Sequence, residues 1–169
     1  MADSKVYLGV SYAQVDEKFS NLEAESSSDA IKVKAGYGDR EAYAIELSIE
    51  LVKNESTIFS TEKKDGDKNS LNIELVKAYD LDIFVLPYLK AGFGTGVLDI
   101  QRDEQKDLSF GSFNFEVGAF VPVNDHLDFE IGYNFKNMSY ENISNESTDD
   151  DLQYKSNVYT LYIGFNTRF

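Results

Sequence analysis

The sequence predicts an all-β protein, an eight-stranded antiparallel up-and-down barrel. Three observations carry this prediction. Apolar and polar residues alternate with period two in eight separate segments, the connections between them alternate between long and short, and the glycines gather on one face of the segments. Successive residues of a strand point to opposite faces, so each segment is typical of a strand with one apolar and one polar face.

The first three segments are KVYLGVSYAQV, AIKVKAGYG and AYAIELSIELV, at 5–15, 30–38 and 42–52. The third also fits a helical stripe, because its Glu, Ala and Leu residues favour helix. Five consecutive apolar residues at period two, between two strand-like neighbours, favour a strand there.

Five further segments follow the same alternation. They are SLNIELVKAY, PYLKAGFGTGVLDI, SFNFEVGAFV, HLDFEIGYNF and VYTLYIGFNTRF, at 70–79, 87–100, 112–121, 126–135 and 158–169.

The connections indicate how the strands are joined. Short ones near 38–41, 80–82 and 122–126 carry the Gly, Asp, Asn and Pro residues of tight turns. The long polar ones are predicted at about 16–30, 54–69, 101–109 and 141–155. Long loops at one end and tight turns at the other are typical of an up-and-down barrel. No linker divides the chain, so residues 1–169 are predicted to form a single domain.

The alternation alone does not decide which face lines the interior. In a soluble lipocalin-like carrier the apolar face surrounds a ligand, whereas in a membrane barrel it faces lipid. Eight of the eleven glycines lie on the polar face, which indicates a shortage of space there, as expected inside a narrow barrel. Phe169 continues the apolar face at the end of the last strand, where a membrane barrel has an aromatic girdle. We therefore predict a transmembrane barrel with a polar lumen.

The polar face carries charges of both signs, and these are expected to pair across the lumen because an unpaired buried charge is very unfavourable. The predicted lumen charge network consists of Lys32, Lys34, Glu46, Glu50, Glu74, Lys90, Glu116, Asp128, Glu130 and Arg168. The apolar face is expected to contact lipid through Val33, Ile45, Leu47, Ile73, Phe115, Ile131 and Leu161.

Composition excludes several classes of function. The formal net charge of −14 argues against nucleic-acid binding, which needs a basic face. With no cysteine, the chain has no thiolate metal site and no cysteine nucleophile. His126, the one histidine, sits in a predicted tight turn, away from any nucleophile. Asp149, Asp150 and Asp151 are interpreted as a solvated acidic loop rather than an ion site. We therefore predict no catalytic residues, no metal, no cofactor and no enzymatic activity.

The whole chain resembles the small eight-stranded outer-membrane barrels of Gram-negative bacteria, of the OmpA transmembrane-domain and OmpX kind. The segments PYLKAGFGTG and DHLDFEIGYNF are similar to the fifth and seventh strands of such proteins. The last strand resembles their C-terminal assembly signal, carried here by Gly164, Phe165 and Phe169, although Thr167 stands where an aromatic residue is common. The resemblance implies export to the bacterial outer membrane. It also implies contact with membrane lipid, lipopolysaccharide and the assembly machinery, and long loops that face the cell exterior.

The expected role is structural or adhesion-like, for a monomer with a closed lumen and with an extracellular ligand at the loops. Phe19, Leu22, Ile58 and Phe59 interrupt the acidic loops, either as binding anchors or as side chains folded over the barrel rim. Two alternatives remain open at this point, a narrow passive channel and a soluble lipocalin-like carrier.

Overall fold

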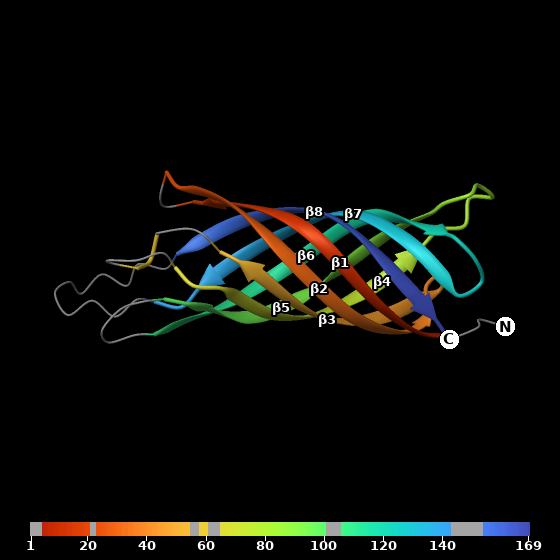
Figure 1. Cartoon of the computed structure of the whole chain (residues 1–169), viewed down its shortest axis with the longest axis horizontal. Helices are drawn as coiled ribbons and strands as arrows, with labels where there is room; N and C mark the ends of the chain where they lie inside the picture. The colour runs from red at the N-terminus through yellow and green to blue at the C-terminus, as the bar shows by residue number, and fades with distance from the viewer. Residues whose placement is uncertain (1–4, 21–22, 55–57, 61–64, 101–105, 143–153) are drawn as a thin grey trace.

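The computed structural model is a closed barrel of eight strands in sequence order (Figure 1). It describes residues 5–20, 23–54, 58–60, 65–100, 106–142 and 154–169. In that part of the chain no helix is long and apolar enough to span a membrane. The strands are β1 Lys5–Phe19, β2 Glu25–Asp39, β3 Tyr43–Lys53, β4 Lys68–Ala78, β5 Leu86–Asp99, β6 Asp107–Pro122, β7 Leu127–Tyr140 and β8 Lys155–Arg168.

Every strand pairs antiparallel with its neighbours, and β1 closes the barrel against β8. The closing register places Tyr7 opposite Arg168 and Ser11 opposite Gly164. The β2–β3, β4–β5 and β6–β7 connections lie at one end of the barrel with the start of β1 and the end of β8, and the other four connections lie at the opposite end (Figure 1). We call these the tight-turn end and the long-loop end.

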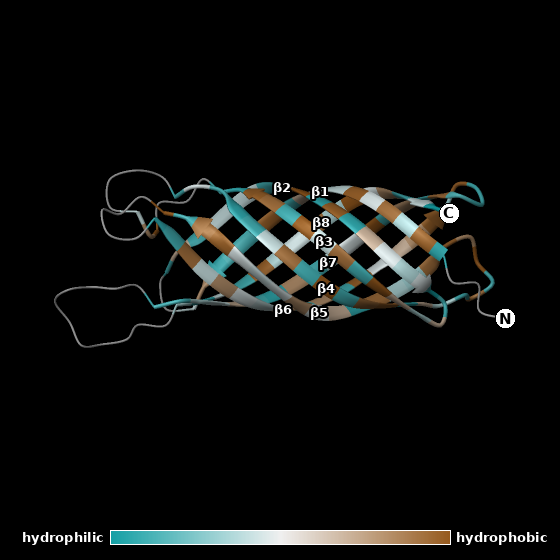
Figure 2. Cartoon of the chain, turned by 90° about the horizontal axis from the view of Figure 1, so that it is seen from below, coloured by the Kyte–Doolittle hydropathy of each residue, from teal (hydrophilic) through white to brown (hydrophobic). Residues whose placement is uncertain are grey.

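The two faces of the barrel differ in polarity, as the banding along the strands shows (Figure 2). The seven apolar side chains expected to contact lipid all point outward, with exposed fractions from 43% to 56%. Charged side chains near the middle of the same strands, such as Lys34, Glu46 and Glu116, point inward and are buried. The interpretation as a lipocalin-like carrier is therefore wrong, since such a barrel would place its apolar face inside.

Buried apolar clusters lie toward both ends of the lumen. Toward the tight-turn end, Tyr7, Tyr88 and Phe120 belong to a small buried cluster. Toward the long-loop end, Phe19 and Phe59 belong to a larger one. Phe59 is 2% exposed and packs edge-on against Phe19, with ring centroids 5.5 Å apart. Of the two interpretations of these loop aromatics, the structure favours side chains folded over the rim. Leu22 lies outside the described residues.

The first long loop is shorter than predicted. The sequence places a loop at about 16–30, but β1 continues to Phe19 and β2 begins at Glu25. The polar residues in between continue the ladder, for example Glu17 opposite Ser26. Their outward side chains are polar because the strands extend beyond the apolar belt, so the period-two signal of apolar residues ends before the strand does. In the same way β6 already begins at Asp107, within the loop predicted at 101–109. Residues 101–105 and 143–153, with Asp149, Asp150 and Asp151, lie outside the described residues.

Close packing explains two of the lumen glycines. A Cβ atom at Gly118 would collide with the Ile131 carbonyl and the Tyr88 hydroxyl, and one at Gly36 would collide with the Tyr7 ring. Glycine is thus needed where large lumen side chains lie flat against the barrel wall.

Candidate functional site: the charged lumen

The charged side chains predicted to line the lumen do face it. All ten members of the predicted set point inward. Nine are buried, and Arg168, near the tight-turn end, keeps 20% of its side chain exposed. They fall into several groups along the barrel axis rather than one network.

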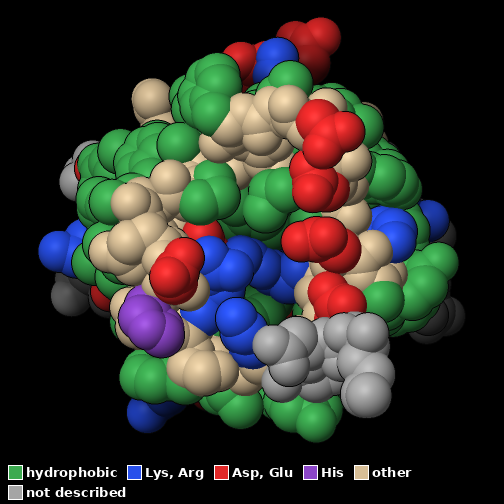
Figure 3. Space-filling model, turned by 90° about the vertical axis from the view of Figure 1, so that its right-hand side faces the viewer, with side chains coloured by type: hydrophobic (Ala, Val, Ile, Leu, Met, Phe, Trp, Pro, Cys, Tyr) green, Lys and Arg blue, Asp and Glu red, His purple; other side chains and the backbone are tan. Residues whose placement is uncertain are grey.

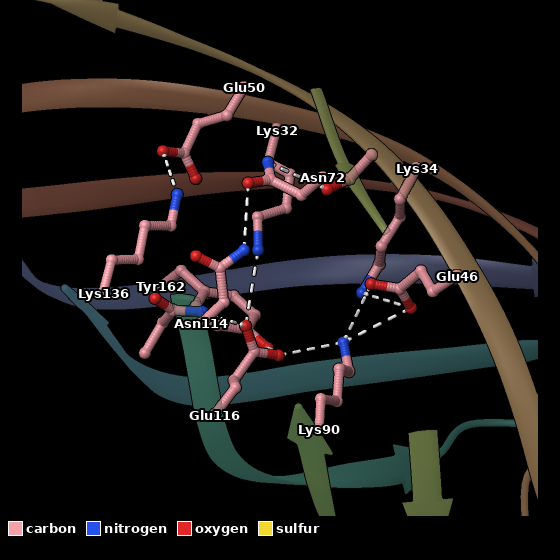
Figure 4. A network of polar contacts seen from close by, with 12 residues as sticks. Lys32, Lys34, Glu46, Glu50, Asn72, Lys90, Asn114, Glu116, Lys136 and Tyr162 are labelled. Carbon is pink, nitrogen blue, oxygen red and sulfur yellow. Dashed lines mark hydrogen bonds and ion pairs between the residues drawn. The ribbon is translucent and has the colours of Figure 1, made fainter. Parts of the chain in front are cut away.

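Lys90 is the centre of the middle group (Figure 4). Its ammonium nitrogen lies 3.1 Å from Glu46 Oε1, 2.9 Å from Glu116 Oε1 and 2.9 Å from Glu130 Oε1. These carboxylates come from β3, β6 and β7, so the ion pairs span the lumen. Lys90 of β5 thereby contacts its neighbouring strand β6 and also β3 and β7, which do not pair with β5.

Two lysines of β2 complete the middle group. Lys34 contacts Glu130 and lies 3.6 Å from Glu46 Oε2, and Lys32 lies 3.3 Å from Glu116 Oε2. Neutral donors add hydrogen bonds to the same carboxylate oxygens. Their bonds to Glu116 and Glu130 come from Tyr162, Tyr88, Asn134 and Asn166. Buried charges in this group thus have both ionic and hydrogen-bond partners, the arrangement that makes burial tolerable.

Glu74 is the exception within the middle group. It is 2% exposed, yet neither carboxylate oxygen has a hydrogen-bond partner among the described residues. It also faces Glu46 directly across β3 and β4. Like charges opposite one another are destabilising in a sheet, so Glu74 is the least satisfied member of the predicted set.

Two ion pairs lie toward the long-loop end. Lys136 Nζ is 2.6 Å from Glu50 Oε1. Glu17 pairs with Lys68 and accepts hydrogen bonds of 2.6 Å from both Tyr140 Oη and Ser156 Oγ. A cavity of about 20 Å³ lies between these pairs, room for about one water molecule.

A separate group lies at the tight-turn end. Asp128 Oδ2 is 2.6 Å from Arg40 Nη2, and its Oδ1 is 3.0 Å from Arg168 Nη2. Two guanidinium groups therefore share one carboxylate. Arg40 also stacks on Phe120, with its guanidinium carbon 4.0 Å from the ring centroid.

The sequence reasoning missed several partners of these groups. Lys136 lies one residue beyond the predicted end of β7 and follows the inward-facing positions of that strand. Extending the predicted alternation by one residue would have identified it. Glu17 and Lys68 fell in predicted loops, and Arg40 fell in a predicted turn. The tyrosines Tyr7, Tyr88 and Tyr162 carried no signal that they would bind carboxylates, because tyrosine occurs on both faces of the strands.

The residues of the predicted assembly signal lie at the end of β8. Gly164 faces the lumen, whereas Phe165 and Phe169 point outward with exposed fractions of 53% and 70%. His126 lies at the tight-turn end, where its ring Nδ1 is 3.2 Å from the Arg168 carbonyl oxygen. The part of the chain that the structure describes contains no group of three acidic, His or Cys side chains able to hold a metal ion.

Solved structures share this architecture. Neisserial surface protein A matches with a TM-score of 0.76 and 14% identity, covering 99% of both chains. Ail, the attachment invasion locus protein of Yersinia pestis, matches with a TM-score of 0.63 and 15% identity, again covering 99% of both chains. The N-terminal barrel domain of Pseudomonas aeruginosa OprF matches with a TM-score of 0.58 and 12% identity, covering 95% of this chain and 97% of the other. At these identities the likeness concerns the fold alone.

No curated protein sequence matches the chain. The model of the outer membrane protein beta-barrel domain matches residues 1–169, the whole sequence. The apolar belt accordingly faces membrane lipid. The chain belongs to the outer membrane protein β-barrel domain family, and it is a protein of the bacterial outer membrane.

Proposed function

We propose that this protein is a monomeric, non-enzymatic barrel with a closed lumen, which presents its long loops outside the cell as an adhesion-like surface. The observation that carries the closed lumen is the position of Lys90. Its three carboxylate partners lie on strands around the barrel, so the bound side chains cross the channel axis. An eight-stranded barrel has an interior only about wide enough for its own side chains.

Planar-bilayer recording tests the closed lumen. We expect no stable, porin-sized conductance from the refolded wild-type protein. A variant with Lys90→Ala and Glu116→Ala removes two crossing side chains and is expected to leak more than wild type, which establishes that the assay detects an opened lumen. A steady wild-type current would favour a narrow passive channel and contradict the closed lumen.

The chemistry of the loops supports a surface role. The first and last of the predicted long loops are acidic, and the chain carries a net charge of −14. The Yersinia pestis protein Ail, a related fold, was crystallised with a heparin analogue, sucrose octasulfate. The acidic loops here would repel such a polyanion, so we propose that the extracellular ligand presents a basic surface.

Shortening the loops tests the surface role. We expect a variant in which the loops at 54–67, 100–106 and 141–154 are shortened to fold, because the strands and tight turns are retained, and to lose binding to host or matrix surfaces. Wild-type binding should weaken as salt is raised, since screening reduces charge attraction. Binding that survives loop removal would contradict the assignment to the loops.

Two further partners are part of this proposal. Lipopolysaccharide is expected around the long-loop end, where Lys18, Lys53 and Lys155 are exposed and suit its phosphates. The assembly machinery is expected to read Gly164, Phe165 and Phe169. The absence of enzymatic turnover is tested with phospholipid and lipid A substrates. Turnover that is abolished by a single carboxylate substitution near the rim, such as Asp99→Asn, would overturn it.

A further inference from the structure

The tight-turn end of the barrel contains a basic hollow that the closed-lumen function does not use. Figure 3 shows Lys and Arg side chains in the centre of this end, with Asp and Glu side chains around them. The hollow has a volume of about 270 Å³ and is lined in part by Lys5, Arg40 and Arg168. Three cationic side chains thus converge on one open cavity at the mouth of the barrel.

Arg40 is held firmly at the wall of this hollow. Its guanidinium lies 4.0 Å from the Phe120 ring centroid and 5.4 Å from that of Tyr7, and Nη2 binds Asp128. Its side chain is 7% exposed. Stacking on two rings and one fixed ion pair hold the group in one orientation before any ligand arrives, which lowers the entropy lost on binding.

The lining sets three cations, Lys5, Arg40 and Arg168, against the carboxylates of Asp39, Glu41 and Asp128, but the charges are unevenly placed. Among the described residues, Asp128 is the carboxylate that Arg40 and Arg168 both contact, so two positive charges share one negative charge. Arg40 Nη1 and Arg168 Nε are both buried and have no hydrogen-bond partner among those residues. Buried N–H groups without partners are unfavourable, and an oxyanion that displaces neighbouring side chains to reach them would satisfy them and add negative charge beside the two guanidinium groups.

Asp39 and Glu41 also line the hollow. Both are acidic residues of the β2–β3 turn region, and they would repel a long polyanion. The occupant that fits both the basic wall and these carboxylates is small.

We propose that the hollow at the tight-turn end binds a small oxyanion of the phosphate or carboxylate class, with Arg40 and Arg168 as its ligands. Arginine suits this ligand because its planar guanidinium offers parallel N–H donors to two oxygens. The site lies at the end opposite the proposed adhesion loops, so it is independent of ligand binding there.

Side-chain NMR of the full chain, labelled with ¹⁵N-arginine and refolded in a nonionic detergent, tests this site. Inorganic phosphate and acetate are titrated separately, with chloride at matched ionic strength as the control. We expect saturable shifts of the Arg40 and Arg168 Nε–H signals with at least one oxyanion, and none with chloride. The two arms distinguish a phosphate from a carboxylate ligand. Equal shifts with chloride, or no saturable shift with either oxyanion, would overturn the proposal.

Paired variants give the test a direction. Arg40→Gln is expected to weaken association roughly tenfold, about the value of one charge-assisted hydrogen bond. Asp128→Asn is expected to strengthen association, because it removes the competing carboxylate. Lys77→Gln removes the same charge at the same end of the barrel but outside the hollow, and is expected to leave binding unchanged.

If Arg40→Gln does not refold, anion binding is measured in Arg168→Gln and Asp128→Asn by following the NMR signal of Arg40. Weaker anion binding in Asp128→Asn would mean that the Arg40–Asp128–Arg168 group has only a structural role. If Lys77→Gln loses as much affinity as either arginine variant, the anion is attracted only by the overall positive charge at this end of the barrel. Either result would overturn the proposed site.

Discussion

Lys90 and Glu116 face each other directly across β5 and β6, and the Lys90 ammonium lies 2.9 Å from Glu116 Oε1. The same ammonium also lies within 3.1 Å of carboxylate oxygens of Glu46 and Glu130. The strand pairing therefore holds one end of an ion-pair group whose other members lie across the lumen. Removing this single cation would leave several buried carboxylates without a counter-ion.

We expect Lys90→Met to lower the free energy of unfolding by about 3–5 kcal/mol, because breaking a buried pair leaves uncompensated charge. Urea titration of the protein refolded into lipid vesicles measures this change. Lys18→Met is the control, since Lys18 pairs with Glu25 at 2.9 Å but both side chains are largely exposed, and we expect little effect. The double variant Lys90→Met with Glu116→Gln should be less destabilised than the sum of its parts. Additive effects would show that the two residues do not interact.

Glu74 should behave in the opposite way to Glu116. Its carboxylate has no hydrogen-bond partner among the described residues and faces Glu46 across the strand pair. We therefore expect Glu74→Gln to leave the stability unchanged or raise it, because it removes a like-charge contact. Glu116→Gln, which disrupts contacts with Lys90 and Lys32, should cost about 3–5 kcal/mol. The same urea titration compares the two variants, and equal destabilisation would contradict the assigned difference.

Packing against the lumen tyrosines predicts a sharp difference between two glycines of β6. We expect Gly118→Ala to destabilise the barrel by about 1–3 kcal/mol through overpacking, because its methyl group would collide with the Tyr88 hydroxyl and the Ile131 carbonyl. Gly111→Ala is the matched control in the same strand. The nearest atom to a Cβ there is the Gly94 carbonyl oxygen at 4.0 Å. If the two variants unfold at the same urea concentration, lumen crowding does not explain the position of Gly118.

The outward face gives a prediction that depends on depth in the membrane. Leu47 lies in the middle of β3 and is half exposed on the outside of the barrel. We expect Leu47→Arg to cost about 2–4 kcal/mol in a lipid-refolded barrel. Leu81→Arg, in the tight turn between β4 and β5, should cost much less because that turn lies outside the strands. An unchanged stability for Leu47→Arg would mean that this face does not contact lipid.

The period-two alternation predicted the strands and their faces because both follow from one physical constraint, the apolar belt outside and the polar lumen inside. It failed where that constraint ends. Glu17 and Lys68 lie on end segments of their strands, at or beyond the apolar belt. No alternating apolar residues marked these end segments as strand. The sequence also did not predict which charged side chains pair with one another in the lumen. That Lys90 contacts Glu130 on β7, or that Arg40 shares Asp128 with Arg168, depends on the stagger of the closed barrel, which alternation does not encode.

The exposed end of β8 separates folding from assembly. Phe169 is 70% exposed, and its backbone N–H donates to the Val6 carbonyl oxygen at 2.9 Å, a bond that does not depend on the side chain. We expect Phe169→Ala to refold in detergent with nearly wild-type stability, but to reach the outer membrane of cells at a reduced level, measured by membrane fractionation. Phe93→Ala is the control, because Phe93 is 66% exposed on the outer face of β5 but distant from the chain end. Equal loss of membrane insertion for both variants would indicate that any outward aromatic serves. Loss for Phe169→Ala alone would support its role as a recognition residue for the assembly machinery.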